Sequence, residues 1–207
     1  MNPLQEESRT QRKRRDIVDA AVALFLEHGY EGTSMDQVAA RATVSKQTVY
    51  KQFKDKESLF AEVVLGLADT AQSFIDLVHT LLAEPDDVER ALKQLARDYL
   101  STVMQPQVLR LRRLLIGEAA RFPQLGGSYY ERVAQRTMDS IAGAFEHLAS
   151  LGKLQLTDPA LAAQHFAFLV LAAPLDRALI CGDGQFTNSE LDRLADEAVR
   201  VFLAAYG

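Results

Sequence analysis

Seven side chains between residues 43 and 51 have the chemistry needed to contact DNA. They are Thr43, Ser45, Lys46, Gln47, Thr48, Tyr50 and Lys51. Glutamine and threonine can hydrogen-bond to base edges, and a threonine methyl can contact a thymine methyl. Lysine neutralises phosphate, and a tyrosine hydroxyl can donate to it. The residue types therefore predict a surface for binding nucleic acid.

Two short helices joined by a tight turn are predicted to position these side chains. Ser34 and Gln37 have the spacing of a reciprocal capping pair, so a helix is expected to begin there. The stretch 43–45 ends that helix, because β-branched residues are poor helix formers and serine favours the cap of a new helix. Val49 and Phe53, four residues apart, would anchor the second helix. The pattern fits a helix that enters the major groove. The alternative is two small helices with a solvated polar face.

A basic segment precedes this unit. Residues 8–15 hold five basic side chains and no acid: Arg9, Arg12, Lys13, Arg14 and Arg15. An amphipathic helix follows, and Gly29 is expected to end it at the position after the cap. Such an arm can follow phosphates or enter the minor groove. The alternative is a solvated tail, especially for residues 1–7.

The charge distribution favours DNA binding at the N-terminal end. The whole chain of 207 residues has a net charge of −5, which argues against general affinity for nucleic acid. Residues 1–56 nevertheless carry ten Lys or Arg against eight Asp or Glu, a net charge of +2, and the other 151 residues carry −7. A dimer would present two positive ends together.

The segment IVDAAVALFLEHGYEGTSMDQVAARATVSKQTVYKQFKDKESLF resembles the N-terminal domain of the TetR family of bacterial transcriptional regulators. The matching motifs are Phe-x-x-x-Gly-Tyr, Gly-Thr-Ser, Ala-x-Val-Ser, Thr-Val-Tyr-x-x-Phe and Lys-x-x-Leu-Phe, in order over residues 10–60. The resemblance implies phosphate contacts from Thr33, Ser34 and Lys56, and a recognition helix around residues 45–51. Gln47 and Thr48 are our candidates for base contacts.

The rest of the chain is predicted to be helical, because no alternating strand pattern persists. Caps and prolines place helices near residues 56–83, 86–104, 107–121, 129–151, 158–180 and 187–205, with a loop at Gly126–Gly127. We therefore expect an all-α fold of about nine helices. Its domains would be an arm with a helix-turn-helix domain over 1–55, and a helical effector-binding and dimerisation domain over 56–207.

The family resemblance implies that the last two helices pair with their copies in a homodimer. The expected interface residues are Phe168, Leu169, Ala172, Leu179, Leu194, Ala198, Val201 and Phe202. A two-fold dimer reads two half-sites, whereas one recognition helix reads little DNA. Helical periodicity alone also allows both faces to be buried within one subunit.

The resemblance also implies a pocket for a small-molecule effector in the middle helices. Candidate lining residues are Phe74, His79, Tyr99, Met104, Phe122, Tyr129, Phe145 and Phe166, and the alternative for each of them is a place in the ordinary core. The stretch LRRLLIGEAARFPQLGGSYYERV resembles the AefR-like subgroup of the family and favours an apolar or amphipathic effector. A ligand of this kind would release a repressor from a palindromic operator in double-stranded DNA.

Other chemistries find little support in the sequence. The four histidines are far apart and the single Cys181 has no cysteine partner, so neither a metal, a cofactor nor a catalytic site is expected. The longest apolar run has ten residues, too few to span a bilayer, and we expect a cytoplasmic protein. One alternative is a helical enzyme or binding protein that kept the fold and lost DNA recognition. Activation in place of repression, and two dimers on one operator, also stay open.

Overall fold

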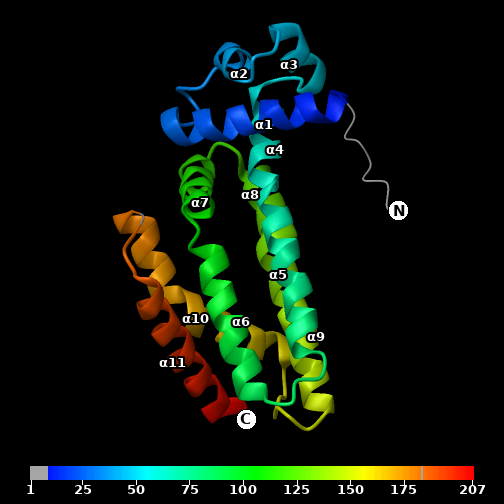
Figure 1. The fold of residues 1–207 in the computed structure, drawn as a ribbon, viewed down its shortest axis with the longest axis vertical. Coiled ribbons are helices and arrows are strands. Elements are labelled where there is room, and N and C mark those ends of the chain that lie inside the picture. Colours follow the sequence, from blue (N-terminus) through cyan, green and yellow to red (C-terminus); the bar gives the residue numbers. More distant parts are fainter. Residues whose placement is uncertain (1–8, 183) are drawn as a thin grey trace, which may run out of the picture. The chain divides into compact units, whose positions relative to one another are not determined.

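The computed structural model describes residues 9–182 and 184–207, and every regular element among them is helical (Figure 1). The elements are α1 (Arg9–His28), α2 (Met35–Arg41), α3 (Lys46–Gln52), α4 (Lys56–Leu65), α5 (Leu67–Leu82), α6 (Val88–Val103), α7 (Pro106–Glu118), α8 (Pro123–Tyr129), the π-helix η1 (Tyr130–Gln135), α9 (Arg136–Ser150), α10 (Pro159–Cys181) and α11 (Asn188–Tyr206). The predicted all-α fold is confirmed. The expected tail at residues 1–7 lies outside the described residues.

The helices join into nine continuous bodies within the described ranges, because two sets run on without a loop. Only Gly66 separates α4 from α5, and α8, η1 and α9 follow one another directly. The predicted loop at Gly126–Gly127 is wrong, since both residues lie inside α8. The helix there begins at Pro123, a residue that fits a first helical turn.

The chain divides into two compact units. The first holds residues up to Gly66 together with 114–126, and the second holds 67–113 with the remainder from Gly127. We expected a domain boundary after residue 55, whereas the first unit extends to Gly66 because α4 packs into it. Phe60 of α4 is fully buried, and its ring lies 5.2 Å from Phe25 and 5.8 Å from Phe122.

An aromatic cluster closes the first unit around Tyr30. Its ring centroid lies 4.8 Å from that of Phe122 and 5.0 Å from that of Phe60. The Arg121 guanidinium lies over the Tyr30 ring at 4.9 Å and forms an ion pair with Glu31. The segment 114–126 therefore contacts the loop after α1 and helix α4 through rings and charge, although it is distant from them in sequence.

The second unit is a bundle in which α5, α6, α9, α10 and α11 share one core. Phe145, Phe166 and Phe202 form its centre, with ring centroids 5.1–5.4 Å apart. Arg97 of α6 donates two hydrogen bonds to Oδ1 of Asp196 on α11, at 2.8 and 3.1 Å, and so fixes the position of these helices. Of these helices, α5, α6, α9 and α10 also contribute to the wall of the cavity described below.

Two helical stretches, Lys56–Leu82 and Pro159–Cys181, are long and apolar enough to cross a membrane by length and composition. Their buried faces carry core residues of the two units, such as Leu59 and Phe166. Helices at the core of a globular fold meet the same criterion, so the finding is weak evidence for a membrane span.

Candidate DNA-binding surface and ligand cavity

Local capping explains why α2 and α3 form where they do. Ser34 Oγ accepts from the Gln37 amide (3.3 Å), and the Ser34 amide donates to Gln37 Oε1 (2.7 Å), which completes a capping box. Ser45 begins α3 by accepting from the Thr48 amide at 3.2 Å. Val49 and Phe53 are buried and hold α3 against the rest of the first unit. The predicted helix-turn-helix is therefore present.

The turn between α2 and α3 is a Schellman motif with an unusual residue. The Val44 amide donates to Ala39 O (3.0 Å) and the Thr43 amide to Ala40 O (3.2 Å), the bond pattern of this helix end. Thr43 occupies the left-handed position at φ +54°, where glycine is favoured. Left-handed backbone costs an L-residue roughly 1–2 kcal/mol. The turn is therefore strained at a residue that the sequence predicts to contact DNA.

Replacing Thr43 with glycine is expected to raise the free energy of unfolding by about 1 kcal/mol, because glycine adopts φ +54° without the Cβ clash. Urea unfolding, followed by circular dichroism, measures the change. The control is Ala40→Gly, an exposed helical position where glycine should instead cost about 1 kcal/mol. A loss of stability in Thr43→Gly would refute the assigned strain.

The candidate DNA contacts differ in how free their side chains are. Gln47, Tyr50 and Lys51 are exposed on α3, and Tyr50 is 53% accessible. The Thr48 hydroxyl bonds to that of Ser45 at 2.8 Å, and Lys46 pairs with Asp36 at 2.5 Å. Lys46 and Thr48 would exchange these contacts for DNA. Gln47, Tyr50 and Lys51 have no such side-chain contact among the described residues.

Thr33 and Lys56, for which phosphate contacts were predicted, bond to backbone carbonyls of the first unit. Thr33 is 2% exposed, and its hydroxyl donates to the carbonyls of Gly29 (2.8 Å) and Leu24 (3.1 Å). Lys56 Nζ donates to the carbonyls of Tyr30 and Thr33, both at 2.9 Å, and lies 4.3 Å from the Tyr30 ring centre. Both side chains thus hold the loop between α1 and α2 in place. The family resemblance predicted their positions near DNA without showing these tertiary bonds.

The expected basic arm is helical from Arg9 onward and forms the first turns of α1. Arg14 is held inside the unit, since its guanidinium lies 4.4 Å from the Phe53 ring centre and pairs with Glu62 at 2.7 Å. Arg12 is exposed. The helix expected to follow the basic segment therefore already begins within it, at Arg9.

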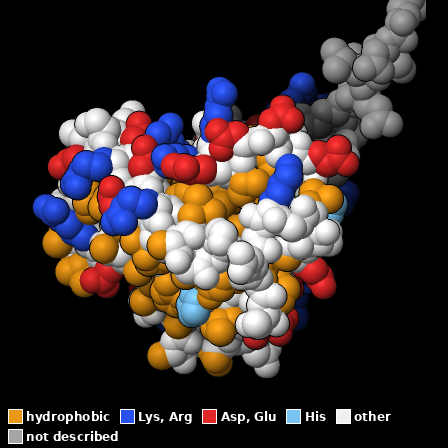
Figure 2. All heavy atoms as spheres, turned by 90° about the horizontal axis from the view of Figure 1, so that it is seen from below, with side chains coloured by type: hydrophobic (Ala, Val, Ile, Leu, Met, Phe, Trp, Pro, Cys, Tyr) orange, Lys and Arg blue, Asp and Glu red, His pale blue; other side chains and the backbone are white. Residues whose placement is uncertain are grey.

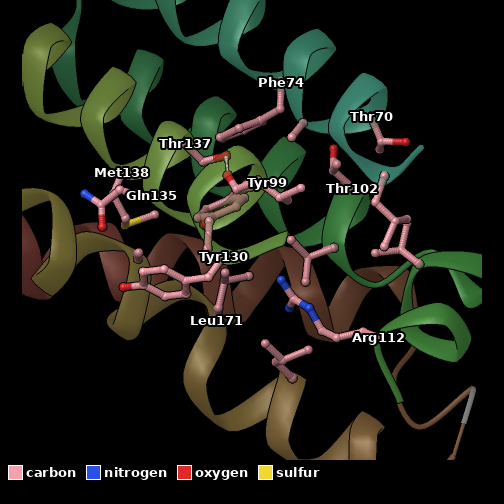
Figure 3. Close-up of a pocket in the computed structure, with 18 of the residues that line it drawn as sticks. Thr70, Phe74, Tyr99, Thr102, Arg112, Tyr130, Gln135, Thr137, Met138 and Leu171 are labelled. Atoms are coloured by element: carbon pink, nitrogen blue, oxygen red, sulfur yellow. Dashed lines mark hydrogen bonds between the residues drawn. The ribbon is translucent and has the colours of Figure 1, made fainter. Parts of the chain in front are cut away.

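A cavity of about 490 Å³ lies within the second unit (Figure 3). This volume falls in the range of about 300–1,000 Å³ typical of small-molecule sites. Its wall is mostly apolar and comes from α5, α6, α7, α8, η1, α9 and α10. The polar side chains in the wall are Thr70, Tyr99, Thr102, Arg112, Tyr129, Tyr130, Gln135, Thr137 and Gln164.

The family models match both parts of this chain. Residues 17–63 match the model of bacterial regulatory proteins of the tetR family, and residues 90–207, more than half of the chain, match the C-terminal domain of AefR-like transcriptional repressors. The chain belongs to the TetR family. The resemblance seen in the sequence, including its AefR-like C-terminal part, is confirmed.

Similar proteins agree with this assignment to the TetR family. A TetR-family transcriptional regulator from Mesorhizobium loti is 45% identical, with a TM-score of 0.92 over 97% of this chain and 100% of that one. The flavonoid-responsive regulator FrrA is 30% identical, with a TM-score of 0.74 over 94% and 97%. A transcriptional repressor from Streptomyces coelicolor is 36% identical over 46% of this chain and 45% of its own length. The chain thus spans about half of that curated relative.

Three of the eight side chains expected around an effector line this cavity: Phe74, Tyr99 and Tyr129. The other five lie elsewhere. Phe145 and Phe166 form the core, Phe122 belongs to the first unit, and Met104 packs beside the core. His79 lies at the surface, 3.3 Å from the Ser140 hydroxyl. Sequence reasoning missed Arg112, and it also missed Tyr130 and Gln135, which reach the wall through the π-helix.

Tyr99 is the most buried phenol of the cavity wall. Its ring stacks on Phe74, with centroids 4.5 Å apart and planes at 16°. Burial raises the pKa of Tyr99 to about 12, and the charge of Arg112 opposes this only in part. The phenol therefore stays protonated at neutral pH and can donate a hydrogen bond.

Tyr99 should make the folded state sensitive to alkali. Because its pKa is raised above the ordinary value of 10.0, its contribution is complete below pH 10 and is lost as pH rises through about 12. We expect wild type to lose about 2–3 kcal/mol more than Tyr99→Phe between pH 9 and pH 12. Urea unfolding across this range measures the difference. Parallel curves for the two proteins would contradict the raised pKa.

A broad apolar face on α10 and α11 remains exposed. Phe168 is 70% and Ile180 75% accessible, with Leu169, Ala172 and Val201 also exposed. Figure 2 shows hydrophobic side chains gathered between charged ones on the surface that it presents. Leu179 and Leu194 are half-buried.

Two of the expected interface residues are corrected by the structure. Phe202 is fully buried and Ala198 is 6% exposed, and both pack in the core of their own subunit. They belong to the inner face of α11, so they leave almost no area for a partner.

No group of three or more His, Cys, Asp or Glu side chains within residues 9–182 and 184–207 is placed to hold a metal ion. Cys181, at the end of α10, is exposed.

Proposed function

We propose that this protein regulates transcription as a homodimer that binds a palindromic operator through α3 and is released by a small ligand. The observation that carries the proposal is that α3 is anchored on one face and exposes polar side chains on the other. Buried Val49 anchors it, while Gln47, Tyr50 and Lys51 are exposed and form no side-chain hydrogen bond or ion pair with residues 9–182 or 184–207. Glutamine suits a base edge, and tyrosine and lysine suit phosphate. The protein would act by binding and not by catalysis, in the cytoplasm.

The exposed face of α10 and α11 supports the homodimer. Large apolar side chains such as Phe168 and Ile180 are stabilised when a partner covers them. A two-fold dimer would present two α3 helices to half-sites about 34 Å apart, or a multiple of that spacing. Dimerisation thus supplies both burial and sufficient contact with DNA.

The cavity supports control by an apolar or amphipathic ligand. FrrA, which is 30% identical, is described as flavonoid-responsive, and the mostly apolar wall of this cavity suits a ligand with an apolar body. Wall residues also lie beside the three places where the chain passes between the units. Leu67 directly follows the first, Arg112 is two residues before the second, and Tyr129 is three residues after the third. A ligand that binds one arrangement of these segments better would shift the equilibrium toward it.

Binding-site selection from a random DNA duplex pool tests the proposal. Recovery of a palindrome, bound with an affinity that falls steeply as salt rises, is the expected result. Recovery of no motif, with only weak salt-sensitive binding, would refute the proposal that the protein regulates transcription. It would favour a helical ligand-binding protein that does not recognise DNA. Purified protein without ligand is the material to use, since the ligand should oppose binding.

A further inference from the structure

The cavity is apolar but holds one permanent positive charge. Arg112 of α7 reaches into it (Figure 3), and none of the described residues that line the cavity is Asp or Glu. Arginine stays charged at all physiological pH values. A buried or half-buried charge is usually paired, so a cation that faces a cavity without a carboxylate leaves room for an anion.

The guanidinium of Arg112 is only partly used. Within the described residues it makes one hydrogen bond, from Nε to the Tyr129 hydroxyl at 3.1 Å, and no ion pair. Its other N–H groups remain available. Because the Tyr129 oxygen accepts from Arg112, its own hydrogen is free to donate elsewhere. Arg112 and Tyr129 thus form a pair of adjacent donors with no acceptor between them.

The rest of the wall suits a flat or elongated apolar body. Phe74 and Tyr99 stack, and Met138, Leu171 and Leu175 add aliphatic surface. The charge is therefore confined to one part of the wall. A ligand that satisfies both parts has an apolar body and one anionic end.

We propose that the effector is an amphipathic carboxylate whose anionic group is bound by Arg112 and Tyr129 while its apolar body packs on Phe74 and Tyr99. The inference rests on the proposed control by a ligand. It specifies in addition that the ligand is anionic and which residues bind its charged group. Charge-assisted hydrogen bonds to carboxylate are stronger than neutral ones, and arginine matches the geometry of a carboxylate. A neutral isostere would leave the guanidinium without its anion.

Titration calorimetry on the full-length protein, without DNA, tests this with matched probes. The probes are 2-naphthoate and laurate, each compared with its primary amide, so that the arms separate aromatic from alkyl bodies. Wild type is expected to bind at least one carboxylate roughly 10- to 100-fold more tightly than its amide. Equal affinities within both pairs, or no binding of either carboxylate, would overturn the proposal.

Variants separate charge from packing. Arg112→Gln should remove the preference for carboxylate and leave amide affinity nearly unchanged, whereas Arg112→Lys should keep a smaller preference. Arg90→Gln, an exposed arginine of α6 outside the cavity, should behave as wild type. A preference that survives in Arg112→Gln overturns the assignment. Thermal unfolding of each variant confirms that it is folded.

The outcomes keep the two proposals apart. A palindrome recovered in the selection, together with equal affinity for carboxylate and amide, would overturn only the ligand class. A carboxylate preference that depends on Arg112, without any recovered DNA motif, would overturn only the proposal that the protein regulates transcription.

Discussion

Changing Gln47 and Lys51 together to alanine is expected to lower operator affinity by roughly 100-fold, since a base-reading glutamine alone contributes about 1–3 kcal/mol. Both side chains are exposed on α3 and would be lost from each half-site. Removing two lysines per dimer should also reduce the slope of log affinity against log salt by about 2. Fluorescence anisotropy with the selected operator, over a salt series, measures both quantities.

The matched control for this variant changes the same residue types in the second unit. Gln107 is exposed on α7, and Lys93 forms a surface pair with Glu89 on α6. The combined Gln107→Ala and Lys93→Ala protein should bind the operator as wild type does, because exposed pairs of this kind contribute little to stability. An equal loss in both double variants would mean that α3 does not read the DNA.

Replacing Phe122 with alanine is expected to cost the first unit about 3 kcal/mol of stability, the usual scale for emptying a buried phenylalanine site. Its ring contacts Tyr30 and Phe60, both of which are buried. Amides of α1 and α4 should therefore exchange faster with solvent, while those in the core of the second unit should change little. Hydrogen exchange followed by mass spectrometry measures the exchange rates of the two units separately.

Ile116 provides the control for Phe122. It belongs to the same segment but is 59% exposed, so Ile116→Ala should alter stability by about 0.5 kcal/mol or less. Equal protection of α1 and α4 in both variants would show that residues 114–126 do not support the first unit.

The helix-turn-helix could be predicted from sequence because its determinants are local. Ser34 with Gln37, and Ser45 with Thr48, cap helices within four residues of themselves. The hydrogen bonds of Thr33 and Lys56 could not be predicted in this way. The bonds of Thr33 to Leu24 and Gly29 depend on how the loop folds back on the end of α1, and the bond of Lys56 to Tyr30 depends on how α4 approaches that loop.

The cavity shows where helical periodicity fails. Phe74 and Tyr99 were within reach of prediction as aromatic residues on apolar faces, but Phe145 and Phe166 have the same pattern and form the core. The π-helix from Tyr130 to Gln135 changes the rotation of the chain between α8 and α9. A constant period of 3.6 residues therefore misplaces the side chains on one side of it.

Two wall residues of the cavity, Phe168 and Ala172, also lie on the exposed face of α10. In the proposed dimer the same side chains would touch the ligand on one side and the second subunit on the other. Association and occupancy then become thermodynamically linked, and each must change the equilibrium constant of the other by the same factor. The protein's apparent affinity for its ligand would consequently vary with its own concentration, so that the abundance of the regulator sets the threshold of its response.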